Sequence, residues 1–510
     1  MTLILTLFIS YLIINYGIKF LKKKSNFVFS ISNKSSPLSV YFSLVASKIN
    51  IQNFILISTI VALEGLKGLW FLLSAYIGHG VVVYVFYPLW SQLNYENEND
   101  LILDRYRTKW GRNLLHFRGL YVGLLVNVII IAMSLLAMVD ILEFFTQIDK
   151  VYLILILCLF NLINSWRSGI QDKIYSDGFN VVFFLFFLGL LIYSNVSEYG
   201  SWTALQENIN NLDQGILEIF PETGTKAFSI FLVYVCIQWW SAQTFDGSGK
   251  TAQRIMGLKD RSKLVLIATH ITEIVIFTLI AFVTLAGISN SKGFLNEVVF
   301  LSVLKTSGSH ISLTLIVLSL LSIYFVAVEG QTNWAGSLIN SSLKRFTTIN
   351  LSRYAYIFLI SFLVAPVSLY FGEVIRVLEF FLGISAGVAP VFVLRWFTPR
   401  INAQTQLAAM ASAVILSILF DKLWEFELFD FISLSNPYPL KIIFVTTFVL
   451  LISFFFSIFT YKEEDRLSFI KFKSKLRYPK AFAFIITKAI IYGVFLCVLY
   501  IILIDLLLYL

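Results

Sequence analysis

Polar and charged side chains interrupt three strongly apolar stretches of this sequence. They are Lys48, Asn50, Gln52 and Asn53 in residues 38–62, Gln238, Trp239, Trp240 and Gln243 in residues 227–246, and Glu329 in residues 308–340. Amide and indole groups can hydrogen-bond to a small solute and stack on it. An isolated Lys or Glu within a bilayer is costly unless it meets a partner or a polar cavity. These groups therefore indicate binding chemistry at membrane depth.

Enzymatic chemistry has little support in the sequence. The four histidines are His79, His116, His270 and His310, and they have no acid at helical spacing and no metal-ligand motif. The sequence also has no G-x-S-x-G motif, no P-loop and no dinucleotide-binding signature. We therefore expect neither an enzyme nor a metal centre, and no organic cofactor.

Composition places the chain in the bilayer. Of its 510 residues, 58% are hydrophobic and only 14% are charged, whereas about a quarter of the residues in a soluble domain are charged. The net charge of +9 belongs to loops between apolar stretches, so it indicates membrane topology and not a nucleic-acid partner. The prediction is an all-α polytopic membrane protein in contact with the lipid bilayer.

Fourteen apolar stretches have the length of a membrane span. They lie at 2–20, 38–62, 67–92, 117–146, 150–166, 177–195, 227–246, 262–288, 308–340, 353–372, 375–396, 404–423, 440–461 and 481–509. If the N-terminus lies outside, 28 of the 39 Lys and Arg fall in inside segments and seven fall in outside loops. This predicts an integral membrane protein whose two termini are extracytoplasmic.

Several short motifs, in order along the chain, resemble the sodium/solute symporter family, most closely its bacterial branch with a Gln-Trp-Trp motif. They are Asp104-Arg105-Tyr106, the run from Phe117 to Gly123 with Asn127, Gln238-Trp239-Trp240, Ala252-Gln253-Arg254, Asn333-Trp334 with Ser337 and Asn340, Leu394-Arg395-Trp396, and Arg400 to Ala403. Together they span roughly residues 38 to 420.

The resemblance implies a LeuT-type core of two five-helix inverted repeats with about four peripheral helices. Residues 1–37 would form a peripheral helix and linker, 38–195 the first repeat, 196–226 an extracytoplasmic loop, 227–396 the second repeat, and 397–510 three peripheral helices. The second and seventh spans, whose polar clusters lie five spans apart, would be the broken helices that build the solute site.

The family's sodium site is altered in this sequence. The resemblance implies an ion held by carbonyls of the first broken helix and by two adjacent hydroxyls, which correspond here to Val326 and Ala327. Neither residue has the oxygen that a hard cation needs. Sodium binding therefore stays open, and Lys48 with Glu329 is the predicted replacement, as a proton carrier or as a permanent ion pair.

The sequence also predicts roles for the remaining site residues. Gln238, Trp239, Trp240 and Gln243 are predicted to line the solute pocket, and Asn50, Gln52 and Asn53 either contact the solute or hydrogen-bond between helices. Asp177 is predicted to cap the N-terminus of the sixth span. The resemblance implies that Arg254 braces the inner gate, and Asn333 belongs to a structural motif.

The sequence therefore predicts a secondary transporter of a small organic solute by alternating access. The alternative is a membrane sensor or scaffold that kept the transporter fold without ion-coupled transport. The solute, the coupling ion and the oligomeric state stay open at this point.

Overall fold

The computed structural model describes residues 36–509 except 94, 96, 166–169, 242–245, 257, 259–262, 291–309, 345–352, 428–435 and 479–481. The predicted first span at 2–20 and Gln243 lie outside the described residues.

The described residues are helical throughout the apolar stretches. In the first half the elements are α2 (Pro37–Lys48), α3 (Ile51–Glu64), η1 (Leu66–Leu69), α4 (Trp70–Leu73), α5 (Ala75–Val81), η2 (Val82–Phe86), α6 (Tyr87–Trp90), α7 (Asn99–Arg105), α8 (Lys109–Leu120), η3 (Tyr121–Val126), α9 (Asn127–Thr146), α10 (Lys150–Ser165), α11 (Ile170–Tyr199), α12 (Trp202–Asn210) and α13 (Gln214–Leu217). The second half contains α14 (Lys226–Cys236), η4 (Gln238–Trp240), α15 (Lys250–Met256), α16 (Leu264–Asn290), α18 (His310–Lys344), α19 (Arg353–Phe371), α20 (Val374–Leu394), α21 (Ala403–Glu425), α22 (Tyr438–Phe459), α23 (Glu463–Lys473) and α24 (Phe482–Tyr509).

Within the described residues, nine helices are long and apolar enough to cross a membrane, and a tenth span results if the bent pair α2–α3 counts as one. Three shorter apolar helices, Lys150–Ser165, Lys226–Trp240 and Ala355–Phe371, lie where the sequence predicts further spans. The chain is therefore an all-α membrane protein, and fourteen spans stays a prediction.

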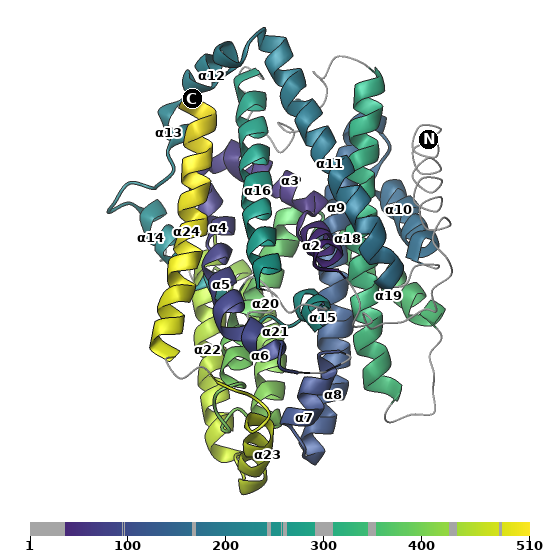
Figure 1. The fold of residues 1–510 in the computed structure, drawn as a ribbon, viewed down its shortest axis with the longest axis vertical. Helices are drawn as coiled ribbons and strands as arrows, with labels where there is room; N and C mark the ends of the chain where they lie inside the picture. The colour runs from purple at the N-terminus through teal and green to yellow at the C-terminus, as the bar shows by residue number, and fades with distance from the viewer. Residues whose placement is uncertain are drawn as a thin grey trace.

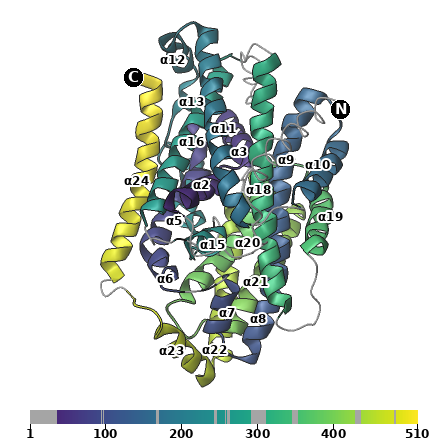
Figure 2. The ribbon, with the colours of Figure 1, turned by 45° about the vertical axis from the view of Figure 1, so that its right-hand side comes forward.

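The helices form one elongated bundle (Figures 1 and 2). The connecting helix α12 and the C-terminus lie at one end, and α7, α8 and α23 lie at the other. In Figure 1, α24 runs along one flank beside α16, while α10 and α19 lie on the opposite flank. Helix α14 of the broken seventh span lies at the edge of the bundle in Figure 1, whereas α15 lies in its interior.

The second predicted span is broken, as expected. Helices α2 and α3 meet at 47°, because Ile49 and Asn50 adopt extended backbone conformations between them. Asn50 is the N-cap of α3, and it is buried. The break thus exposes backbone groups to the protein interior at a point where no bilayer water is available.

The seventh predicted span is broken as well. Helix α14 ends at Cys236, η4 covers Gln238–Trp240, and α15 begins only at Lys250. Between them Gly247 and Gly249 have φ values of +69° and +84°. Residues other than glycine rarely adopt such backbone conformations. These glycines allow the chain to turn from one half of the span to the other.

Two further irregularities have no counterpart in the predicted pattern. The helix turns are widened to the π type at Val82–Phe86 and at Tyr121–Val126. At the second site Asn127 Nδ2 donates to the carbonyl oxygen of Val122 at 2.6 Å. Such π turns leave irregular backbone that often lies at functional sites.

Helices α5 and α24 approach so closely that glycines are required on both. A Cβ atom on Gly80 would lie 1.9 Å from the carbonyl oxygen of Ala489, and one on Gly493 would lie 2.7 Å from Cα of Ile77. Small residues permit such close helix contacts in membranes. This contact fixes α24 against α5.

We expect Gly80→Ala to destabilise the protein by roughly 1–3 kcal/mol, because the added methyl group meets backbone that cannot move aside. The matched control is Gly189→Ala on α11, where a Cβ atom meets nothing within 4 Å. Thermal unfolding of both variants in detergent measures the effect. Equal melting temperatures for the two would show that the α5–α24 contact is not tight.

Candidate functional site

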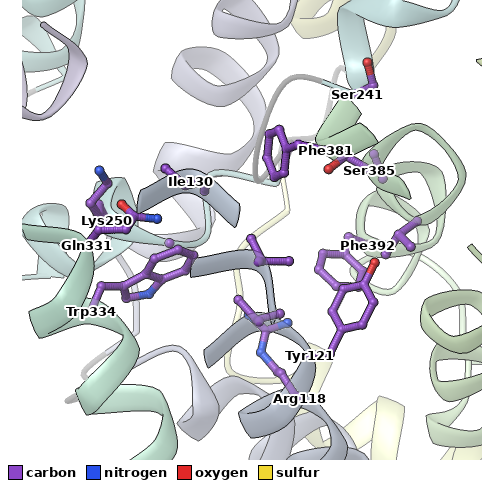
Figure 3. Close-up of a pocket in the computed structure, with 15 residues that line it drawn as sticks. Arg118, Tyr121, Ile130, Ser241, Lys250, Gln331, Trp334, Phe381, Ser385 and Phe392 are labelled. Atoms are coloured by element: carbon purple, nitrogen blue, oxygen red, sulfur yellow. The ribbon is translucent and has the colours of Figure 1, made fainter. Parts of the chain in front are cut away.

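The larger cavity lies between both halves of the bundle and encloses about 710 Å³ of empty space, including its open mouth. Helices α8, α9, α18 and α20, the π turn η3 and the break between η4 and α15 surround it. Its lining comprises Arg118, Tyr121, Val122, Val126, Ile130, Ser241, Gly249, Lys250, Gln331, Trp334, Phe381, Ser385, Val388, Ala389 and Phe392. In Figure 3, Gln331 and Trp334 face Phe381 and Phe392 across the space.

Several buried polar groups at this cavity have no hydrogen-bond partner in the described part of the chain. They are both amide atoms of Gln331, the indole nitrogen of Trp334, and Nε and Nη1 of Arg118. Buried polar groups in proteins are nearly always hydrogen-bonded. A solute bound in the cavity can supply these partners, which makes this cavity the candidate solute site.

Arg118 is held in place by a buried carboxylate. Its Nη2 lies 3.0 Å from Oε1 of Glu98, and the two side chains are 1% and 3% exposed. The other oxygen of Glu98 accepts from the Gly249 backbone N–H at 2.7 Å. Glu98 thus links α8 to the second half of the broken seventh span.

A second buried ion pair anchors the same break. Arg395 at the end of α20 donates from Nε to Oδ2 of Asp246 at 3.1 Å, and Trp396 Nε1 donates to the same oxygen at 2.8 Å. Trp90 Nε1 donates to the backbone oxygen of Asp246 at 2.6 Å. Asp246 and Arg395 are fully buried, so the segment after η4 is fixed to α20 and α6.

The Gln-Trp-Trp motif, which is predicted to line the solute pocket, does not line the larger cavity. Gln238 Nε2 donates to the carbonyl oxygen of Phe71, and its Oε1 accepts from the Tyr438 hydroxyl at 3.0 Å. Both ends of this amide are therefore occupied by protein. Trp239 Nε1 donates to the carbonyl oxygen of Cys236 at 3.1 Å. In this part of the chain, the first residue that lines the larger cavity is Ser241, which follows Trp240.

The amides of the first break divide between two roles. Gln52 accepts from the Ser134 hydroxyl at 2.7 Å, so it joins α3 to α9. Asn50 and Asn53 line a second, smaller cavity together with Lys48, Tyr76 and Glu273.

Lys48 has partners other than the predicted Glu329. Its Nζ lies 2.7 Å from His79 Nε2 and 3.6 Å from Glu273 Oε2. The expected pairing with Glu329 is thus replaced by a carboxylate on α16, because the end of α2 packs towards α5 and α16. Sequence spacing could not reveal this contact, since Lys48 and Glu273 are far apart along the chain.

The predicted ion-site positions lie on α18, and their role stays a prediction. Val326, Ala327 and Glu329 are buried, and the first two have no hydroxyl group. Gln331 and Trp334, one turn apart on the next part of the helix, reach the larger cavity. The sequence analysis assigned neither a binding role, although their spacing of three places them on one face.

Arg254 and Asp177 belong to one buried chain of hydrogen bonds. Arg254 Nε donates to the Ser43 hydroxyl at 2.9 Å, and Ser43 donates to Asp177 Oδ2 at 2.6 Å. The predicted capping role of Asp177 is wrong, because α11 begins at Ile170 and Asp177 lies inside it. Its carboxylate serves α2 and not its own helix terminus. Asn333 is buried, and its Nδ2 has no hydrogen-bond partner among the described residues.

At the end of the bundle that carries α23, Asp104 joins α7 to the segment that follows α23. Lys475 Nζ lies 2.7 Å from both carboxylate oxygens, the Tyr95 hydroxyl donates at 2.6 Å, and Arg107 also pairs with it. Burial acts to raise the pKa of Asp104, but these hydrogen bonds outweigh it and lower the pKa below its ordinary value of 3.8.

We expect Asp104→Asn to lower the melting temperature by the same amount at pH 8 and pH 5. A carboxyl group whose folded pKa is lowered stabilises the fold above its unfolded pKa, and the stabilisation is lost as pH falls through the folded value. The difference from wild type should thus shrink only below about pH 4. Glu464→Gln, exposed on α23, is the control, and a difference that vanishes already at pH 6 would contradict the assignment.

We expect Arg395→Met to cost about 3–5 kcal/mol of stability, because it leaves the Asp246 carboxylate buried without its cation. The exposed Arg376→Met is the matched control, since Arg376 is 65% exposed in its ion pair with Glu373. Chemical or thermal unfolding compares the two. Similar stability of both variants would show that Asp246 is solvated in the folded protein.

No protein-family model and no curated protein sequence matches this chain. Among solved structures it is similar to a Na⁺-coupled sialic acid symporter in a substrate-bound, outward-open state, with a TM-score of 0.67 and 15% identity over 90% of this chain and 96% of that one. Mhp1, a nucleobase-cation-symport-1 family transporter, gives 0.42 with 12% identity over 88% and 100% of the two chains.

A manganese transporter of Eremococcus coleocola gives a TM-score of 0.44 with 14% identity over 84% of this chain and 94% of that one. The neighbours are membrane transporters, not enzymes. The chain has a LeuT-type transporter fold, and it is an integral membrane protein.

Proposed function

We propose that this protein is a secondary transporter that moves a small organic solute by alternating access. The single observation that carries the proposal is the larger cavity, where Gln331, Trp334 and Arg118 present buried polar atoms that have no hydrogen-bond partner among the described residues. The LeuT-type fold supports it, since such folds bind solutes beside broken helices near the midplane.

The cavity favours a compact solute with a hydrogen-bond-accepting or anionic group. Donors predominate among its unpartnered polar atoms, with nitrogens from Arg118, Trp334 and Gln331 against one acceptor oxygen of Gln331. Phe381, Phe392 and Tyr121 supply apolar and aromatic walls. A carboxylate would complement the donors, and a planar or ring-shaped body would pack on the aromatic side chains.

The finer assignment follows the sequence motifs. We place the chain near the bacterial branch of the sodium/solute symporters, with two five-helix repeats at 38–195 and 227–396 and both termini outside the inner membrane. The 28-to-7 division of Lys and Arg supports this orientation. Sodium coupling lacks support at Val326 and Ala327, whose side chains offer no oxygen to an ion.

The proposed gate is the pair of ion bridges below the cavity. Glu98–Arg118 and Asp246–Arg395 both hold the segment between η4 and α15, and Arg254 joins α15 to α2 through Ser43. Movement of α15 would therefore require these contacts to rearrange together. Gln238 has a structural role in this proposal, since its amide ties η4 to Phe71 and Tyr438.

The test is uptake into proteoliposomes of a panel of labelled acidic sugars, amino acids and monocarboxylates, each with imposed sodium and proton gradients. We expect saturable uptake of one class. Binding without any flux would favour a transporter-derived sensor, and neither binding nor flux would contradict the proposal.

We expect Trp334→Phe to weaken binding of the transported solute about fivefold, because a hydrogen bond in a buried site contributes about 1 kcal/mol and an aromatic ring is kept. Trp110→Phe, at a partly exposed tryptophan on α8, is the matched control. Isothermal titration or a binding-induced shift in melting temperature gives both affinities. Unchanged affinity in Trp334→Phe would place the solute elsewhere.

A further inference from the structure

Four ionisable side chains gather where the first broken span ends its first half. Lys48 Nζ lies 2.7 Å from His79 Nε2 on α5, and Glu273 Oε2 on α16 lies 3.6 Å from Lys48 Nζ and 3.8 Å from His79 Nε2. The ring of His270, one turn before Glu273, has its centroid 4.2 Å from that of His79. We call these residues the Lys48 cluster.

The contact between Lys48 and His79 joins two basic nitrogens, so one proton lies between them. The Lys48 ammonium donates, and His79 Nε2 accepts through its lone pair. If His79 gained a further proton, Nε2 would become a donor and two cations would face each other at this distance. Lys48 would then have to leave His79, and Glu273 could pair with either cation.

The titratable groups around the Lys48 cluster do not change their charge near neutral pH, so any change of charge must come from the cluster itself. Tyr76 on α5 lies 5.1 Å from His79 between ring centroids, and Tyr492 on α24 lies 6.3 Å from His270. Cys497 on α24 donates to the carbonyl oxygen of Leu73. Phenol and thiol groups keep their protons at neutral pH.

The cluster lies at a structural break with unsatisfied groups. Lys48 and Glu273 line the smaller cavity of about 280 Å³ together with Asn50. Asn50 Oδ1 and the Nδ1 atoms of His79 and His270 are buried without a hydrogen-bond partner in the described structure. A cluster that served only as a static ion pair would not need two imidazoles in contact with each other.

We propose that the Lys48 cluster is a proton-binding site whose occupancy decides whether the end of α2 stays attached to α5 and α16. The proton comes from water on one side of the membrane, binds to the imidazole of His79, and breaks the Lys48–His79 contact. It leaves to water on the other side, after which the contact re-forms. This rests on the proposed transport function, in which the site would couple solute movement to protons.

Proton binding can be tested without a solute, because the chain has only four histidines. In protein labelled with ¹³C and ¹⁵N histidine in nanodiscs, we expect the His79 and His270 signals to shift together between pH 5 and pH 8.5, as coupled groups do. The signals are assigned with His79→Gln and His270→Gln, because each variant lacks the signal of one histidine. Signals that stay constant over this range would overturn the proposal.

A charge variant distinguishes the cluster from an ordinary buried histidine. Lys48→Gln removes the facing cation, so the titration midpoint of His79 should rise by at least about one pH unit. His116 on α8 serves as the internal control, and Lys48→Gln should leave its signal unchanged. An unchanged His79 midpoint would show that Lys48 does not act on it.

Movement of α2 gives the second readout. Spin labels at Leu38 on α2 and Leu264 on α16, both exposed, report the distance between the two helices in a cysteine-free background. The distance distribution should change between pH 8 and pH 5.5 in the otherwise wild-type cluster, and it should not change in His79→Gln. A distribution independent of pH in both would overturn the proposed control of α2.

Uptake separates this inference from the transport proposal. If a solute of the panel is taken up and a proton gradient drives it, His79→Gln should abolish the pH dependence while His116→Gln keeps it. Uptake that ignores the proton gradient would overturn the coupling and leave the transport function standing. If no solute moves, the transport function fails, and the histidine titration alone decides whether the cluster binds a proton.

Discussion

The structure depends on one constraint: polar groups at membrane depth must find partners inside the protein, because the bilayer core offers none. Breaking a span releases backbone donors and acceptors, so each break requires surrounding side chains. Around the seventh span Asp246 and Glu98 perform this role, with Arg395, Trp396 and Arg118 completing the set. Around the second span Asn53 Nδ2 donates to the carbonyl oxygen of Lys48, while the Lys48 side chain turns towards α5 and α16.

This constraint links the two broken spans mechanically. Arg254 on α15 donates to Ser43 on α2, and Ser43 donates to Asp177 on α11. The second half of one broken span is therefore hydrogen-bonded to the first half of the other through a buried hydroxyl. A displacement of either segment leaves a buried guanidinium or carboxylate without its partner, which is costly. The two halves are thus expected to move together and not independently.

Sequence reasoning located the apolar helices of the described residues and the two breaks, because the length of an apolar stretch and polar residues within it are local signals. It described the breaks at Asn50 and after Trp240 correctly, while it could not identify side-chain partners that depend on helix packing. Glu273 was overlooked for this reason, as its contact with Lys48 joins distant parts of the chain. The sequence cannot show whether an amide in an apolar span binds a solute or another part of the protein. Gln238 is therefore predicted to line the pocket, whereas in the structure its amide bonds to Phe71 and Tyr438.

The replacement of hydroxyls by Val326 and Ala327 has a consequence for any coupled cycle. A sodium ion changes the charge of its site by binding and by leaving. A lysine ammonium is part of the chain, and it can change the charge of its surroundings only by moving or by exchanging a proton. Lys48 has a neutral acceptor in His79 and a carboxylate in Glu273 within reach, so both responses are available without an unpaired charge entering the bilayer. In the proposed cycle, a fixed cation beside a titratable acceptor would let protons replace a diffusible sodium ion.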